Sequence, residues 1–480
     1  MTETTQSQDD ELAGELEKGS PIVARVGLFL GPALAAVALL AAPSLGLSRD
    51  SGWVFAMLVL MACWWVTLAV EPAVTGLIPF IGLAALGIGK PAEIASPYAN
   101  DVMFLFAGGS LLAFALERTG VSACFATGLV RLAGTSPLRI LAAVMLASAL
   151  MSAFVSNLAT AATMLPLSIA LGARARQAAA TEDARAAAAR FTTSLLLGIA
   201  FASSIGGALT IVGSPPNPIA VEWLEKNGVG MDFVRWLRFS VPTTAVFLPI
   251  AIAVLGLWLF PARGITVPRA DDEPLRISRD GWLTLAIFLA AVGAWVSVDL
   301  PSVKDGTIAV AAAVLLFLIP STERQGRGIL DAASFTKIPW RVLVLFGGGL
   351  CLADAMQRTG LSASLGAIIQ SAGTLTPVVL LTVLVALLVF SSEVASNTAL
   401  AAMAVPIVGA LAPGLGMAPE ALVIPTVFAA SWAFALPVGT PPNALVFASG
   451  RVRSQDMMRA GLVLDLIAIV VIVTMASLLL

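Results

Sequence analysis

The sequence predicts an all-α membrane protein that crosses the bilayer many times. Of its 480 residues, 58% are apolar and 12% are charged, whereas a soluble globular protein carries roughly 25% charged residues. Eleven apolar stretches approach the length that spans a ~30 Å hydrocarbon core. Two longer apolar stretches each hold a polar Ser-Asn pair near the middle. The predicted fold is therefore eleven transmembrane helices plus two re-entrant hairpins.

The same composition excludes several classes of function. The 27 basic and 29 acidic residues give a net charge of −2, which offers no basic surface for nucleic acid. Histidine is absent, and with it the commonest general base and metal ligand. The three cysteines form no CxxC pair, so a thiol metal site is not expected. An intramembrane enzyme would need a nucleophile with a base, an aspartate dyad or a metal cluster. The sequence has no His and no Asp pair at matched mid-membrane positions, so we do not expect an enzyme.

The crossings follow in chain order from the apolar stretches. The first 20 residues are polar and acidic, so residues 1–24 are expected to form a polar tail outside the bilayer. A crossing needs about 20 mainly apolar residues. The expected crossings are 25–43, 52–70, 72–89, 101–117, 191–212, 240–260, 281–299, 305–320, 340–357, 421–438 and 461–480.

Two apolar stretches, 137–171 and 376–412, do not fit this series as single crossings. Each holds about 35 residues around Ser156-Asn157 or Ser396-Asn397. Arms of ~15 residues at 1.5 Å per residue reach ~22 Å, which is less than the ~30 Å core. We therefore expect two hairpins that enter and leave on the same side.

The distribution of positive charge predicts the orientation. With this layout, twenty Lys and Arg residues fall on the side of the N-terminus and seven on the other side. Basic residues concentrate on the cytoplasmic side. The sequence therefore predicts a multi-pass protein of the inner (plasma) membrane, with a cytoplasmic N-terminus and an outward C-terminus.

An internal repeat relates the two halves of the chain. FAGGSLLAFALERTGVSAC (106–124) matches FGGGLCLADAMQRTGLSAS (346–364) at 11 of 19 positions without a gap, at an offset of 240. The two Ser-Asn pairs match at the same offset. An odd number of crossings separates the copies, so they face opposite ways. Inverted repeats are typical of secondary transporters, with binding near the midplane at the repeat interface.

A second duplicated string follows each hairpin. IVGSPPNPIA (211–220) resembles PVGTPPNALV (437–446) at an offset of 226. Each proline removes an N–H and clashes with the preceding turn, so neither string continues a helix. Unwound backbone at membrane depth is tolerated where it lines a cavity or is buried in protein. We expect broken helices at 213–217 and 439–443.

The four breaks suit an anion and hard cations. A broken helix leaves free N–H groups, which attract anions, and free carbonyls, which with Ser, Thr and Asn oxygens attract Na⁺. Two sets of such groups are expected to hold Na⁺: Ser152, Ser156, Asn157 and Gly213 in the first half, and Ser392, Ala395, Asn397 and Gly439 in the second. The remaining hydroxyls and amides are expected to bind the two ends of a small dianion: Asn157, Ser214, Asn397, Thr398 and Thr440.

Glu393 is an acidic residue inside the second hairpin, three residues before Ser396. An ionisable residue at membrane depth is a functional hypothesis by default. It strengthens the second cation site or takes a proton, or else it caps or pairs locally within the hairpin. The sequence leaves both interpretations open.

The paired hairpin motifs SerAsnLeuAlaThr (156–160) and SerAsnThrAlaLeu (396–400), with GSPPN, GTPPN and EPAVTGLIPF (71–80), resemble those of the divalent anion/Na⁺ symporters. That family carries di- and tricarboxylates and, in some branches, sulfate. The resemblance covers nearly the whole chain. It implies that substrate carboxylates meet both tips and the residue before each Pro-Pro-Asn: Ser156, Asn157, Ser396, Asn397, Thr398, Ser214 and Thr440. One position departs from the family pattern, because Leu158 replaces a Thr and removes a hydroxyl from the substrate side.

The resemblance also implies a homodimer in which a transport domain moves as an elevator against a scaffold. The expected divisions are scaffold 25–135, transport domain 136–262, scaffold 263–360 and transport domain 361–480.

The sequence thus predicts a Na⁺-coupled symporter of a small dicarboxylate such as succinate. The alternatives are a Na⁺-independent di- or tricarboxylate exchanger, a sulfate carrier of the same family, or a channel. No Lys, Arg or His lies within ten residues of Ser156 or Ser396. A fixed basic group that would replace the cation is therefore missing, which favours coupling to Na⁺.

Overall fold

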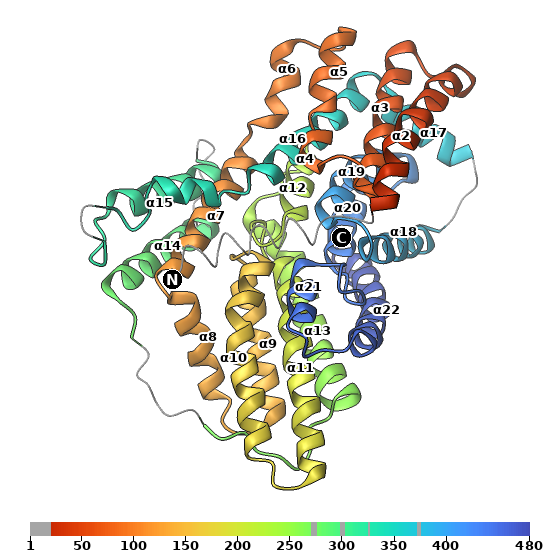
Figure 1. Cartoon of the computed structure of the whole chain (residues 1–480). Coiled ribbons are helices and arrows are strands. Elements are labelled where there is room, and N and C mark those ends of the chain that lie inside the picture. Colours follow the sequence, from red (N-terminus) through yellow and green to blue (C-terminus); the bar gives the residue numbers. More distant parts are fainter. Residues whose placement is uncertain (1–20, 270–275, 298–302, 325–326, 372–375) are drawn as a thin grey trace.

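The computed structural model describes residues 21–269, 276–297, 303–324, 327–371 and 376–480 (Figure 1). These residues form helices and connecting segments, and no strand beyond an isolated bridge between Pro320 and Gly328. Eight of the described helices are long and apolar enough to cross a membrane. The predicted all-α, multi-span class is confirmed.

The chain begins with helices that precede the first repeat and lie together at the top of Figure 1. Helices α2 and α3 pack against each other, and α4 packs on α16 of the second repeat. The elements are α2 (Pro21–Ala41), η1 (Ala42–Leu45), α3 (Arg49–Thr67), α4 (Pro72–Thr75), α5 (Ile78–Leu86), α6 (Pro91–Ala95) and η2 (Ser96–Tyr98).

The first repeat and the connection that follows it form the middle of the chain. Helices α9, α10 and α11 run side by side (Figure 1). The elements are α7 (Asp101–Arg118), α8 (Val121–Leu132), α9 (Pro137–Ser152), α10 (Asn157–Gln177), α11 (Glu182–Gly207), α12 (Pro216–Lys226), α13 (Phe233–Ala253), η3 (Val254–Leu259), α14 (Arg279–Ser297), α15 (Asp305–Leu318) and η4 (Ala332–Lys337).

The second repeat reproduces several helix boundaries of the first. The first and last residues of α18 follow those of α9 by 240 positions. The first residue of α19 follows that of α10 by the same number. The elements are α16 (Trp340–Arg358), α17 (Leu361–Ser371), α18 (Pro377–Ser392), α19 (Asn397–Leu411), η5 (Pro413–Leu415), α20 (Pro419–Ser431), α21 (Pro441–Ala448) and α22 (Ser454–Leu479). Both predicted Ser-Asn stretches are therefore a helix, a break and a helix, whereas their re-entry into the bilayer remains a prediction.

Several predicted boundaries were wrong. The expected crossing 72–89 is split between α4 and α5, where Gly76 brings the chain against the backbone of Leu345. The expected crossing 421–438 ends as α20 at Ser431. The arm expected to stop at 171 continues to Gln177, with Arg174 in a last turn that suits cations.

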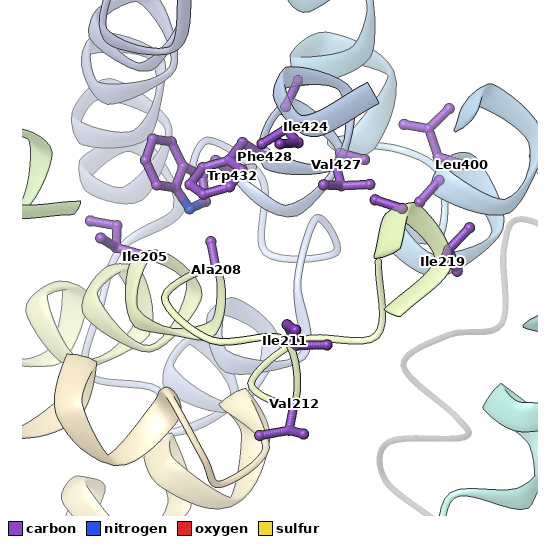
Figure 2. Close-up of a cluster of buried hydrophobic side chains, with 14 of the residues drawn as sticks. Ile205, Ala208, Ile211, Val212, Ile219, Leu400, Ile424, Val427, Phe428 and Trp432 are labelled. Atoms are coloured by element: carbon purple, nitrogen blue, oxygen red, sulfur yellow. The ribbon is translucent and has the colours of Figure 1, made fainter. Parts of the chain in front are cut away.

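The two repeats interlock around a shared apolar core. Helix α12 of the first repeat packs on α19 and α20, and α21 of the second packs on α10 and α11. Figure 2 shows Ile205 and Ala208 beneath Trp432, and Ile219 beside Val427. The core also holds Phe247 stacked on Trp432, with ring centroids 4.6 Å apart. Each broken helix is thus fixed in place by the opposite repeat.

Candidate cation and anion site

The tip of the first hairpin is closed by its own polar side chains. The Ser152 hydroxyl donates to Asn157 Oδ1 at 2.7 Å across the break. Ser156 is the N-cap of α10, and its hydroxyl accepts from the backbone N–H of Ala159 at 3.3 Å. Ser152 is fully buried, whereas Ser156 is exposed and Asn157 is half-buried. The break is therefore stable as a local structure and presents its tip outward.

The first broken helix is held open by one asparagine. Helix α11 ends at Gly207 and α12 begins at Pro216. The amide Nδ2 of Asn217, which is fully buried, donates to Gly207 O at 2.9 Å and to Thr210 O at 2.8 Å. These bonds satisfy carbonyls that the missing helical turn leaves free. The Asn of the first Pro-Pro-Asn string therefore acts as an internal cap.

Gly213 lies against a ring of backbone oxygens. A Cβ added there would be 2.6 Å from Gly207 O, 2.8 Å from Ala153 O and 2.9 Å from Ser152 O. Only glycine leaves room for this approach. Carbonyl oxygens of unwound backbone are the groups that coordinate Na⁺ in broken-helix transporters. The residues present thus fit a small hard cation at this point.

The second broken helix repeats the asparagine device. Nδ2 of Asn443 donates to Leu436 O at 3.1 Å and to Ala433 O at 3.4 Å. These acceptors match Thr210 and Gly207 at the offset of 226. The Thr440 hydroxyl also accepts from the N–H of Asn443 at 3.3 Å, and so caps α21. The two breaks are therefore equivalent in construction as well as in sequence.

The second hairpin tip differs from the first. Nδ2 of Asn397 lies 3.5 Å from Ser431 O, and no bond joins Ser392 to Asn397. Within the described part of the chain, Ser392 Oγ, Asn397 Oδ1 and Ser431 Oγ are buried without a hydrogen-bond partner. Buried oxygens of this kind normally have a partner, so these three are available to a ligand.

Glu393 reaches from this tip to the unwound segment. Its Oε1 accepts from Ala435 N at 2.7 Å and its Oε2 from Leu436 N at 2.6 Å. Oε2 also lies 2.8 Å from the position of a Cβ on Gly439. The interpretation that Glu393 pairs locally within its hairpin was wrong, because its partners belong to the segment after α20.

The structure brings together part of each predicted site. Ser152 and Asn157 bond directly, and the backbone of Ser152 lies beside Gly213. Ala395 and Ser214 are buried, whereas Ser396 and Thr398 are half-buried at the second tip. Sequence reasoning missed three residues that shape the breaks: Asn217, Asn443 and Asp465. The first two carry a signal, because both duplicated strings contain Pro-Pro-Asn with Asn217 or Asn443 as its last residue.

Two interlocked repeats, each with a broken hairpin and a broken helix, define a class of protein. They place unwound polar backbone inside an apolar helical bundle, which is the construction of a secondary transporter. The chain is a membrane transporter and not an enzyme.

Comparisons with known proteins place it more closely. Residues 26–479 match the family described as the sodium:sulfate symporter transmembrane region, and the chain belongs to that family. It is 34% identical to the sodium-dependent dicarboxylate transporter SdcS of Staphylococcus saprophyticus over 465 residues, which is 93% of this chain and 90% of that one. SdcS of Staphylococcus aureus (strain USA300) is also 34% identical, over 93% of this chain and 89% of its own. The resemblance to divalent anion/Na⁺ symporters is confirmed.

A solved structure shares the fold. The YdaH transporter of Alcanivorax borkumensis superposes with a TM-score of 0.58 at 16% identity, over 83% of this chain and 88% of that one. At this identity the likeness concerns the fold alone.

Proposed function

We propose that the protein is a Na⁺-coupled symporter of small dicarboxylates, of which succinate is the type. The observation that carries the proposal is the oxygen ring at Gly213. The carbonyl oxygens of Ser152, Ala153 and Gly207 lie 2.6–2.9 Å from the position that a Cβ on Gly213 would occupy. It supports coupling because uncharged oxygens of a broken helix suit Na⁺. The relatives named SdcS are called sodium-dependent dicarboxylate transporters, which supports the same coupling and substrate class.

In this proposal each repeat holds one Na⁺ beside one end of the dianion. The first Na⁺ takes oxygens of Ser152, Ser156, Asn157 and Gly213. The second takes those of Ser392, Ala395, Asn397 and Gly439. The substrate carboxylates then receive hydrogen bonds from the tips and from the residues before Pro-Pro-Asn: Ser156, Asn157, Ser396, Asn397, Thr398, Ser214 and Thr440. No Lys, Arg or His lies within ten residues of Ser156 or Ser396 in the sequence, so Na⁺ offsets the negative charge of the substrate.

The movement that we propose is an elevator. Residues 136–262 and 361–480 form the transport domain, and 25–135 with 263–360 form the scaffold that carries a homodimer contact. Interlocking of α12 with α19 and α20 supports treating the two transport segments as one unit. We place the protein in the inner (plasma) membrane with the N-terminus cytoplasmic and the C-terminus outward, on the basis of the charge distribution.

Uptake into proteoliposomes tests the coupling. An inward Na⁺ gradient is expected to drive concentrative succinate uptake, and Asn157→Ala or Asn397→Ala is expected to abolish it in a folded protein. Counterflow of succinate in the complete absence of Na⁺ would instead support an exchanger. Uptake of sulfate in preference to succinate would support the sulfate carrier. A succinate conductance that does not saturate would support a channel.

A further inference from the structure

The two broken helices share the asparagine cap but differ in the other groups that hold the unwound segment. In the first, four consecutive carbonyls accept from neutral donors. Gly207 O and Thr210 O bond to Asn217, Ala208 O accepts from Trp236 Nε1 at 3.1 Å, and Leu209 O accepts from Ser240 Oγ at 2.6 Å. No charged side chain takes part in these bonds.

In the second broken helix, three consecutive amides donate to carboxylates. Glu393 accepts from Ala435 N and Leu436 N, and Oδ1 of Asp465 accepts from Phe434 N at 3.1 Å. Asp465 lies on α22, is 0% exposed and directly neighbours Glu393. Gly461, one turn earlier, lets α22 approach the backbone of Phe434.

This carboxylate pair belongs to the second repeat alone. At the repeat offsets of 240 and 226, Ala153 and Phe239 occupy the equivalent positions in the first repeat. Neither carboxylate takes part in an ion pair with a basic residue in the described part of the chain. Oδ2 of Asp465 is buried without a hydrogen-bond partner. Two adjoining buried carboxyl groups without a basic partner are unfavourable unless a proton or a nearby cation offsets their charge.

The second proposed cation site lies beside this charge. Glu393 Oε2 occupies the space next to Gly439 that carbonyl oxygens occupy next to Gly213. Ser392 Oγ at the end of α18, Ser431 Oγ at the end of α20 and Asn443 Oδ1 in α21 are buried without a hydrogen-bond partner in the described part of the chain.

We propose that the two cation sites are unequal, and that Glu393 and Asp465 make the second-repeat site the tighter one, which fills first. Glu393 acts as a further oxygen neighbour of the cation, and Asp465 is a positioning residue that acts through the Phe434–Leu436 segment. This inference rests on the proposed Na⁺ coupling and assigns the order in which the two cation sites fill. The first-repeat site, built of neutral groups, then fills at higher Na⁺ concentration.

Hydrogen–deuterium exchange on the unaltered protein tests the order. Exchange is followed at the tip segments 393–397 and 153–157 while Na⁺ replaces K⁺ at constant ionic strength, without substrate. We expect protection of the second tip at a Na⁺ concentration about tenfold lower than that of the first, which corresponds to ~1.4 kcal/mol. Equal midpoints, or earlier protection of the first tip, would overturn the inference and leave Na⁺ coupling intact. Absence of any Na⁺ effect at either tip would contradict the proposed function itself.

Variants test the assigned residues. Glu393→Gln and Asp465→Asn keep side-chain size and remove charge, so each is expected to raise the second-tip midpoint about tenfold, with the first-tip midpoint unchanged. Asp280→Asn is the matched control, because Asp280 is also buried and also accepts hydrogen bonds, from Ser321 and Thr322, but lies outside both sites. If both test variants keep the wild-type midpoint, the carboxylates do not set the order.

Discussion

Single residues control the breaks because each break leaves a small number of backbone groups to satisfy. Gly213 matters because of the space it leaves, since three carbonyl oxygens lie within 2.9 Å of the position of an added Cβ. Asn217 and Asn443 matter for the opposite reason, because each fills its break and donates to two carbonyls.

Gly213→Ala is expected to abolish Na⁺-dependent uptake. The added methyl group would displace the carbonyl oxygens that form the proposed cation site, and overpacking of this kind costs about 1–3 kcal/mol. Uptake in proteoliposomes and the melting temperature check both effects. Gly293→Ala is the control, because nothing lies within 4 Å of its added Cβ. Wild-type Na⁺ dependence in Gly213→Ala would contradict the assignment.

Asn217→Ala and Asn443→Ala are each expected to lower the free energy of unfolding by about 1–3 kcal/mol, because two buried carbonyls lose their donor. Uptake should fall in parallel, since the unwound segment is no longer fixed. Thermal unfolding and uptake are measured together. Asn227→Ala, at the C-terminal end of α12, should have a smaller effect, because Asn227 donates to a single carbonyl of its own helix and its bond from Gln357 lies at an exposed position. Equal stability of all three variants would argue against the internal caps.

The helices beside the unwound segments are short because specific residues begin or end them. Helix α21 has only eight residues, begins with Pro441 and Pro442, and depends on the Thr440 cap. A helix this short gains little from its own hydrogen bonds. Its position therefore depends on the cap and on packing against α10 and α11.

Thr440→Ala is expected to destabilise the protein by about 1 kcal/mol through loss of the cap and to raise the KM for succinate, because the hydroxyl is also a proposed substrate donor. Thr440→Ser should restore both. Ser136→Ala is the control, since Ser136 is an N-cap whose side chain makes no cap bond. An unchanged KM in Thr440→Ala would remove Thr440 from the substrate site.

The helix breaks were predictable because their signals are local. Ser156-Asn157, Ser396-Asn397 and the two Pro-Pro-Asn strings stop helices by their own chemistry. Other elements were missed because their signals are weak or distant. Helix α8 (Val121–Leu132) lies between the predicted crossing 101–117 and the predicted hairpin 137–171, where no element was predicted because the segment is short and carries polar residues. The hydrogen bond from Phe434 N to Asp465 Oδ1 joins positions 31 residues apart, and sequence spacing does not reveal such contacts.

At the scale of the whole molecule, the proposed transport function depends on the two repeats facing opposite sides of the membrane. The helices on the two sides of each Ser-Asn break begin at an offset of 240, and α12 and α21 each pack into the other repeat. An anion held between the two tips would thus contact both repeats, whereas each proposed cation site belongs to one repeat. This arrangement links the orientation of the chain to its function.

Surface labelling is expected to show the N-terminal side inside the cell. In a variant without Cys63, Cys124 and Cys351, a membrane-impermeant maleimide should label Lys90→Cys on intact cells. Arg453→Cys should be labelled only after permeabilisation, because positive charge concentrates on the cytoplasmic side. The reverse pattern would contradict the orientation, and labelling of both on intact cells would contradict the number of crossings between them.

Thermal stabilisation of the purified wild-type protein tests most directly whether the anion and Na⁺ bind at one coupled site. Succinate is added in Na⁺ and, separately, in K⁺ at equal ionic strength. A ligand at 100 times its Kd stabilises by about 2.7 kcal/mol, so a clear rise in Tm is expected in Na⁺. No rise is expected in K⁺, because the carboxylates then lack the cations that offset their charge. An equal rise in both salts would contradict the account.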